Sequence, residues 1–189
     1  MLTLVKTYRA WRSDHRGVAA IEFALAVPIL LSLFLGGVDV MRVMLLHQKV
    51  EKIAYAMADL VTQQDQLTRA NMNDYYEAPS EIIAPFTFGA NGVVIITSIY
   101  RDVGDPVSGK VRWRDSGGGT LVRTSRIGAV GANAVLPGGL TLNERDNVLI
   151  AEVYYRFEQL FPVDFLDVED IYKAAVYKPR LGSQISAPQ

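Results

Sequence analysis

The longest apolar stretch of the chain lies near its N-terminus, at residues 18–38. It spans 21 residues, of which only Glu22 and Ser32 are polar. A helix of about 20 apolar residues is long enough to cross the hydrocarbon core of a bilayer. Residues 1–17 carry a clear excess of basic side chains, whereas the residues that follow the stretch are balanced in charge. The positive-inside rule therefore predicts a membrane helix whose N-terminus is cytoplasmic.

Beyond residue 38 the apolar side chains recur every three or four residues, as on one face of an amphipathic helix. This stripe consists of Val43, Leu46, Val50, Ile53, Met57 and Leu60. No Gly or Pro interrupts residues 38–70, so the pattern predicts one helix that continues from the membrane segment over residues 39–70. We expect the stripe to pack on a following sheet, and packing on a neighbouring subunit is the alternative.

The chain after residue 70 has the pattern of a β-rich domain. Residues 71–92 contain two prolines and an Asn-Gly pair, which predicts a connecting loop. Four later segments have the composition of strands, at residues 93–100, 110–114, 147–158 and 171–177. A helix followed by strands, without alternating β-α-β units, predicts an α+β fold. We expect a long N-terminal transmembrane and amphipathic helix packed on an antiparallel β-sheet.

The strand patterns also predict which side chains are buried. Residues 93–100 are apolar on both faces, which suits a central strand. In residues 110–114 the alternation places Val111 and Trp113 on one face and basic residues on the other. In residues 147–158 one face carries a row of apolar side chains, namely Leu149, Ala151, Val153, Tyr155 and Phe157.

The composition argues against several classes of function. The net charge is −1, whereas electrostatic binding of nucleic acid requires a clear positive excess. The absence of cysteine excludes disulfides, thiolate metal sites and cysteine nucleophiles. The run Gly117–Gly119 lacks the Lys-Ser/Thr pair of a phosphate loop, and no G-x-S-x-G motif occurs. We expect no enzymatic activity, no cofactor, no metal and no nucleic-acid partner.

His47, a group of acidic residues and a group of arginines each allow two interpretations. His47 has no second ligand at a metal-binding spacing, so we expect a surface or interface histidine. A group of acids lacks the spacing of an EF-hand, so we expect a solvated loop rather than a calcium site; these acids are Asp164, Asp167, Glu169 and Asp170. Four arginines fit either a basic patch or exposed charges at alternate strand positions; they are Arg112, Arg114, Arg123 and Arg126.

Glu22 is the one charged residue of the apolar stretch. A charged group at the centre of a membrane helix costs roughly 2.5–3.5 kcal/mol on insertion scales. Cleavage between Gly17 and Val18 would create an α-amino group four residues before Glu22, about 6 Å away along a helix. This positive charge and the helix macrodipole would both favour a carboxylate at that position. Alternatively, the Glu22 side chain reaches the membrane interface and has no such role.

The segment around Glu22 resembles the processing site of type IV prepilins, which has a basic leader, a Gly before the cut and a Glu at the fifth mature position. Residues 16–45 are most similar to the TadE-like minor pilins, or pseudopilins, of the tight-adherence (Tad/Flp) pilus. In that group an aromatic residue follows the Glu, a Pro lies within the helix, and a Gly-acid-Arg segment ends the span. The residues that carry the resemblance are Arg16, Gly17, Val18, Glu22, Phe23 and Pro28.

The resemblance implies a function and a location. A prepilin peptidase would recognise Arg16, Glu22 and Phe23 and remove the leader, residues 1–17. The mature chain would cross the bacterial inner membrane once, through residues 18–38, and place a β-rich domain, residues 71–189, in the periplasm. It would lie in or at the base of an adhesive pilus. The expected partners are other pilin or pseudopilin subunits, the prepilin peptidase, the pilus assembly machinery and the lipid bilayer.

Several alternatives stay open. A cleaved secretory signal would need a shorter apolar run and small residues before the cut. A plain signal anchor explains the length and orientation of the run but not Glu22. In function, the main alternative is an unprocessed single-pass anchor that carries a periplasmic interaction domain. Pro28 removes the backbone hydrogen bond to the Ala24 carbonyl, and this marks either a simple kink or a stretch that loosens during assembly.

Overall fold

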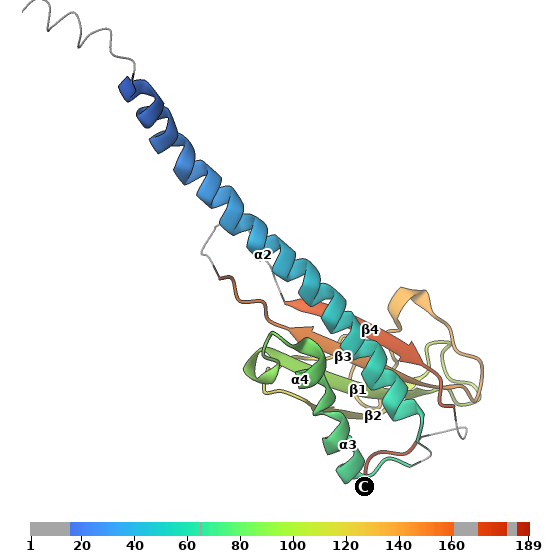
Figure 1. Ribbon diagram of the computed structural model, residues 1–189. Coiled ribbons are helices and arrows are strands. Elements are labelled where there is room, and N and C mark those ends of the chain that lie inside the picture. Colours follow the sequence, from blue (N-terminus) through green and yellow to red (C-terminus); the bar gives the residue numbers. More distant parts are fainter. Residues whose placement is uncertain (1–15, 65, 161–169, 181–184) are drawn as a thin grey trace, which may run out of the picture. The chain divides into compact units, whose positions relative to one another are not determined.

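The structure is a computed structural model that describes residues 16–64, 66–160, 170–180 and 185–189 (Figure 1). Its helices are α2 (Arg16–Thr62), α3 (Arg69–Tyr75) and α4 (Ala78–Ile83), with short 3-10 turns η1 (Gly89–Asn91) and η2 (Pro137–Gly139). Its strands are β1 (Gly92–Tyr100), β2 (Lys110–Gly117), β3 (Asn147–Tyr155) and β4 (Ile171–Tyr177).

The described residues fall into two units. The first comprises α2 up to Arg42 together with Gln159 and Leu160. The second comprises the rest of α2, the helices α3 and α4, the sheet, and the other described residues.

In the first unit, α2 is apolar and exposed. Its most apolar window has a mean hydropathy of 2.4, and 0% of that window is buried. Within the described part of the chain, α2 is the helix that is long and apolar enough to cross a membrane. Pro28 lies inside α2 without ending it, and the Ser32 hydroxyl donates a hydrogen bond of 2.9 Å to the Pro28 carbonyl oxygen. The predicted membrane segment is therefore helical throughout.

The second unit is built on an antiparallel sheet with the strand order β2-β1-β3-β4 (Figure 1). The central strands β1 and β3 pair without interruption from Gly92–Tyr155 to Tyr100–Asn147. Every residue of β3 is buried, and so is every residue of β1 except Tyr100. Residues 93–100 are thus the central strand that their composition predicts, and the predicted α+β fold is confirmed.

One face of the sheet packs against α2. The predicted stripe makes this contact, since Leu46, Val50, Ile53 and Met57 are at most 1% exposed. They share a core cluster with apolar side chains of β1 and β3, among them Val94, Ile96, Leu149, Ala151, Val153 and Tyr155, and with Phe157, which follows β3. Full burial of one such side chain contributes about 1.5–3 kcal/mol. The expectation that the stripe packs on the sheet is confirmed.

The opposite face of the sheet is covered by the connection between β2 and β3. Its apolar side chains form a second cluster with residues of β1, β2 and β3, made of Ile99, Val111, Ile127, Ala134, Leu136, Leu142, Val148 and Ile150. Glu152, which is 0% exposed, anchors the same connection. Its carboxylate accepts hydrogen bonds from the Ser125 hydroxyl, from the Arg126 N–H (2.9 Å) and from the Tyr172 hydroxyl (3.1 Å). These bonds offset the cost of burying the charge.

The region after α2 differs from the prediction in two respects. The helix ends at Thr62, before the expected end at residue 70, because Leu67 leaves the helical path to enter the core, where it is 3% exposed. The expected loop at 71–92 contains two short helices. The Thr68 hydroxyl accepts a hydrogen bond from Asn71 N–H and caps α3, and Pro79 lies in the first turn of α4, where a proline is tolerated.

Strand β2 also differs from the prediction. Val111 pairs with Ile99 and Trp113 pairs with Ser98, so Arg112 is an extra residue in a β-bulge. A bulge shifts the alternation of side chains by one position. Val111 therefore lies in the cluster under the β2–β3 connection, whereas Trp113 lies in the cluster under α2. The prediction that both side chains share one face is wrong for this reason.

Candidate processing and assembly site

The residues that carry the prepilin resemblance all lie on α2. Arg16 and Gly17 open the helix, and Val18 follows with 48% of its surface exposed. A Cβ atom built on Gly17 would have nothing within 4 Å. Val18 and Glu22 are four residues apart, so their side chains lie on the same face of the helix. The structure thus leaves the predicted cleavage position open and aligns Glu22 with the residue that would become the new N-terminus.

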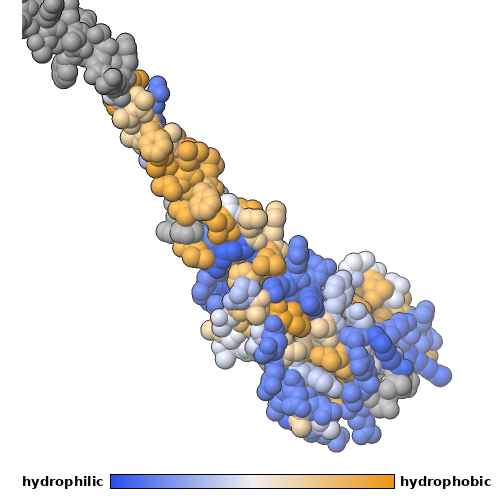
Figure 2. Space-filling view, viewed as in Figure 1, coloured by the Kyte–Doolittle hydropathy of each residue, from blue (hydrophilic) through white to orange (hydrophobic). Residues whose placement is uncertain are grey.

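The surface around Glu22 is apolar on all sides of the helix. Figure 2 shows hydrophobic side chains along this part of α2. The exposed members near Glu22 include Ile21 (63%), Phe23 (70%) and Leu25 (68%), and the series goes on past Pro28 with Ile29, Leu30, Leu31, Leu33 and Phe34. A helix that is hydrophobic on every side requires an apolar environment. Glu22 is exposed near the N-terminal end of this apolar surface.

A buried carboxylate lies at the end of the apolar stretch, and the sequence did not predict one of its partners. Asp39 is 0% exposed, and its Oδ1 accepts hydrogen bonds from the Leu160 N–H (3.2 Å) and from the Arg42 guanidinium (2.9 Å). Asp39 and Arg42 are three residues apart, so their pairing follows from helical spacing. The contact with Leu160 joins two segments far apart in the chain. The Gly-acid-Arg pattern marks Asp39 in the sequence but does not indicate this contact.

The triple glycine has a structural role. A Cβ on Gly119 would lie 2.2 Å from the Gly92 carbonyl oxygen and 2.4 Å from that of Gly89. This close approach lets the Thr120 N–H donate to the Gly89 carbonyl (2.9 Å) and the Leu121 N–H donate to the Gly92 carbonyl (3.2 Å). Glycine is therefore required here because another part of the backbone occupies the space of a side chain.

The four arginines do not form a basic patch. Arg112 pairs with Asp102, and Arg123 pairs with Asp170. The remaining two also face groups within the chain. Arg114 donates to the Thr97 hydroxyl (3.1 Å) and to the Gly128 carbonyl (2.6 Å), while the Arg126 guanidinium lies 4.1 Å from the centre of the Tyr172 ring. These side chains hold the β2–β3 connection and neighbouring strands together.

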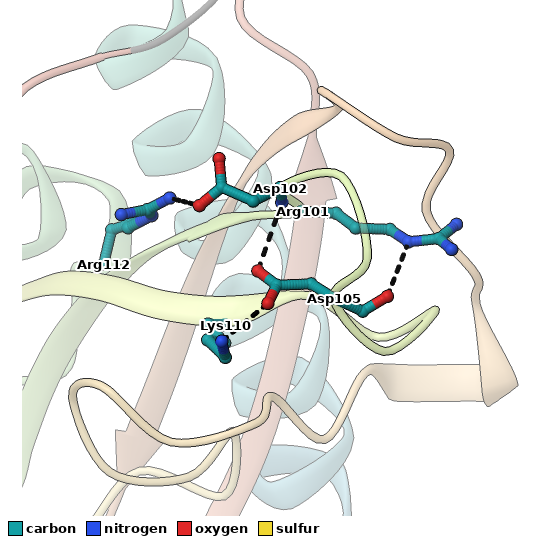
Figure 3. Close-up of polar contacts among 5 residues, drawn as sticks. All are labelled: Arg101, Asp102, Asp105, Lys110 and Arg112. Carbon is teal, nitrogen blue, oxygen red and sulfur yellow. Dashed lines mark hydrogen bonds and ion pairs between the residues drawn. The ribbon is translucent and has the colours of Figure 1, made fainter.

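Figure 3 shows a polar network at the turn between β1 and β2. The Asp105 carboxylate accepts hydrogen bonds from Lys110 Nζ (2.6 Å) and from the Asp102 N–H (3.2 Å). The bond with Lys110 is the main reason that the pKa of Asp105 is lowered. Arg101 Nε donates to the Asp105 carbonyl oxygen (3.3 Å), and Arg112 holds Asp102. These hydrogen bonds and ion pairs hold the turn in place.

Among the described residues no cluster of three or more His, Asp or Glu side chains is placed to hold a metal ion. His47 is exposed on α2. Of the acids near the C-terminus, Asp170 is paired with Arg123, and the other three, Asp164, Asp167 and Glu169, lie outside the described residues. The leader, residues 1–15, also lies outside them.

Fold and site together define an α+β protein with an exposed apolar N-terminal helix able to span a membrane. Residues 17–59 match the family model described as TadE-like protein. This confirms the resemblance to the TadE-like group over that part of the chain and relates it to proteins of Tad pili. No curated protein and no solved structure matches the chain.

Proposed function

We propose that this chain is a minor pilin of a Tad-type pilus, matured by a prepilin peptidase that cleaves between Gly17 and Val18. The observation that carries the proposal is the TadE-like match, which begins at Gly17. It coincides with a helix whose apolar window is 0% buried. An exposed apolar surface of this kind has to be covered, either by a membrane or by a bundle of similar helices.

The proposed chemistry at the site is hydrolysis of the Gly17–Val18 peptide bond by the peptidase. Water adds across the bond, so that Gly17 gains a carboxylate and Val18 gains an α-amino group. The first turn of α2 contains no acidic residue, so Glu22 is the acid nearest to the new amino group on the same helix face. Within one subunit or between neighbours, this amine and the Glu22 carboxylate would neutralise each other in the apolar environment.

The proposal also includes location and partners. The basic leader would keep the N-terminus in the cytoplasm, and α2 would cross the inner membrane once. The second unit would then lie in the periplasm, where it acts by contact and not by catalysis. Other pilin-like subunits, the peptidase and the assembly machinery of the inner membrane would be its partners.

The test is the mass of the N-terminal peptide of the chain purified from cells that contain the cognate peptidase. We expect a chain that begins at Val18. Gly17→Ala should leave most of the chain unprocessed, because we expect the peptidase to recognise the residue before the cleaved bond. Gly37→Ala is the matched control, since at both glycines an added Cβ has nothing within 4 Å. Both variants should therefore fold equally well.

An intact Met1 start in the presence of the peptidase would refute processing. It would favour the unprocessed membrane anchor with a periplasmic interaction domain. Equal processing of the Gly17→Ala and wild-type chains would show that Gly17 is not the recognised residue.

A further inference from the structure

The exposed apolar surface of α2 extends beyond the apolar stretch at residues 18–38. Met41, Met44 and Leu45 are 73%, 62% and 40% exposed. They are three or four residues apart, so they lie on one face of the helix. The next exposed residue of that face is the polar Gln48. The apolar surface of α2 therefore ends near Leu45, about two helical turns after the end of the apolar stretch.

The two charged residues in this part of α2 do not make the surface strongly polar. Asp39 is 0% exposed and forms an ion pair with Arg42, whose side chain is 25% exposed. Charged side chains that lie at membrane depth are usually paired with one another, because pairing lowers the cost of removing them from water. The exposed surface of α2 is therefore mainly apolar up to Leu45.

The length of this surface matches a whole bilayer rather than its hydrocarbon core alone. Residues 18–45 form a helical segment about 42 Å long, at about 1.5 Å per residue. The hydrocarbon core of a bilayer is about 30 Å thick, and the bilayer with its headgroup layers is about 40–45 Å thick. When residues 18–38 fill the hydrocarbon core, the turns that carry Met41, Met44 and Leu45 lie at the level of the headgroups.

A residue from a distant part of the chain lies at the same level of α2. Leu160 belongs to the connection that follows β3, and its N–H donates a hydrogen bond of 3.2 Å to Asp39 Oδ1. Asp39 lies two residues before Met41, about 3 Å away along the helix axis. Leu160 is 56% exposed. The hydrogen bond thus holds an exposed apolar residue beside the turns of α2 that would lie among the headgroups.

We propose that Met41, Met44, Leu45 and Leu160 contact the headgroup layer of the bilayer, and that Asp39 positions Leu160 for this contact. Lipid is the partner that this surface fits, because the surface continues the part of α2 whose apolar window is 0% buried. Removal of these apolar side chains from water stabilises the contact. The inference rests on the membrane placement of α2 in the proposed function and is independent of the processing step.

Single labelled cysteines test the contact in the full chain, because the natural sequence has no cysteine. Met44→Cys and Leu160→Cys would each carry the fluorophore NBD, in chains reconstituted at low density in vesicles of phosphatidylethanolamine and phosphatidylglycerol. A nitroxide attached to the lipid headgroup should quench both labels. Ile29→Cys, in the middle of the span, should be quenched by a nitroxide placed deep in the acyl chain, and it reports whether α2 lies in the bilayer.

Each labelled position has a matched control. Tyr55 lies on the same face of α2 as Met44 and is 48% exposed, but it is about 16 Å further along the helix. Val103 is 65% exposed, comparable to Leu160, and lies in the connection between β1 and β2, at the other end of the sheet. Quenching by the headgroup nitroxide should be at least about threefold weaker at Tyr55→Cys than at Met44→Cys, because of this separation. We expect the same difference between Val103→Cys and Leu160→Cys.

The role of Asp39 is tested in the same vesicles. In the Asp39→Ala chain the Leu160→Cys label should fall to the quenching level of its control, whereas the Met44→Cys label should keep its quenching because α2 itself holds it. Asp39→Asn should preserve quenching at Leu160→Cys, since the amide oxygen can still accept a hydrogen bond from the backbone N–H. Unchanged quenching at Leu160→Cys in the Asp39→Ala chain would overturn the positioning role.

The other outcomes separate this inference from the proposed function. Quenching of Ile29→Cys together with control-level quenching at Met44→Cys and Leu160→Cys would overturn the inference and leave the membrane placement intact. Absence of quenching at Ile29→Cys would overturn both. Protection of the Met44→Cys and Leu160→Cys labels from the nitroxide and also from aqueous iodide would overturn the lipid contact and show that protein, such as a second copy of the chain, covers this surface.

Discussion

Glu22 and Asp39 are two carboxylates on one helix with different environments. Asp39 is buried and bonded to Leu160 and Arg42, whereas Glu22 is exposed among apolar side chains. Glu22 could be singled out from the sequence because it is the one charge in an apolar run. The contact of Asp39 with Leu160 could not, because the two residues are 121 positions apart and no local pattern connects them.

We predict that the charge of Glu22 is needed for pilus assembly but not for cleavage of the leader. Glu22→Gln keeps the size of the side chain and removes its charge, so it should leave cleavage after Gly17 intact. It should reduce the amount of pili about tenfold, which corresponds to the loss of about 1.4 kcal/mol, within the range for a charge near a helix N-terminus. The N-terminal mass and an immunoblot of sheared pili measure the two steps.

Glu81→Gln is the control for this change, because Glu81 is an exposed acid on α4. It should leave both maturation and piliation unchanged. Wild-type piliation in the Glu22→Gln strain would show that the charge has no part in assembly.

Helix α2 and the central strands could be predicted from the sequence, because their buried side chains recur at a regular spacing along the chain. The stripe of α2 and the apolar positions of β1 and β3 repeat at the spacing of a helix and of a strand. The bulge at Arg112 could not be predicted, because the same alternating sequence is compatible with a regular strand and with a strand that contains a bulge. The early end of α2 depends on Leu67 reaching the core, which is a tertiary contact that overrides helix propensity.

The helix–sheet contact leads to a prediction on stability. Ile53→Ala should lower the free energy of unfolding of the second unit by about 2–5 kcal/mol, because Ile53 is 0% exposed between α2 and the sheet. Met44→Ala, on the same helix, should change it by less than about 0.5 kcal/mol, since Met44 is 62% exposed. Urea unfolding of the detergent-solubilised chain, followed by near-ultraviolet circular dichroism, measures both. Equal effects of the two variants would mean that this face of α2 is not the packed one.

For the molecule as a whole, we predict that stability falls with acidification. The pKa of Asp105 is lowered mainly by its bond with Lys110, and the pKa of Asp146 mainly by its bond with Lys178. A carboxyl whose pKa is lower in the folded state than its ordinary value, about 3.9 for Asp, stabilises the fold at higher pH. This contribution is complete above the ordinary pKa and is lost as the pH falls through the folded-state value.

The measurement is the midpoint of urea unfolding at a series of pH values between about 7 and 2. The wild-type midpoint should decline most steeply below about pH 4. The double variant Asp105→Asn and Asp146→Asn should start from a lower midpoint and decline less. A decline of the same steepness in both chains would assign the acid sensitivity to other carboxylates.

The β2 edge of the sheet is poorly suited to growth by the addition of strands from other copies. A sheet that is open on both sides can add copies without end, as cross-β fibrils do. In this chain the β2 border is interrupted by the bulge and partly covered by residues 131–134. A polymer of this protein has to extend through other surfaces, such as the exposed apolar part of α2.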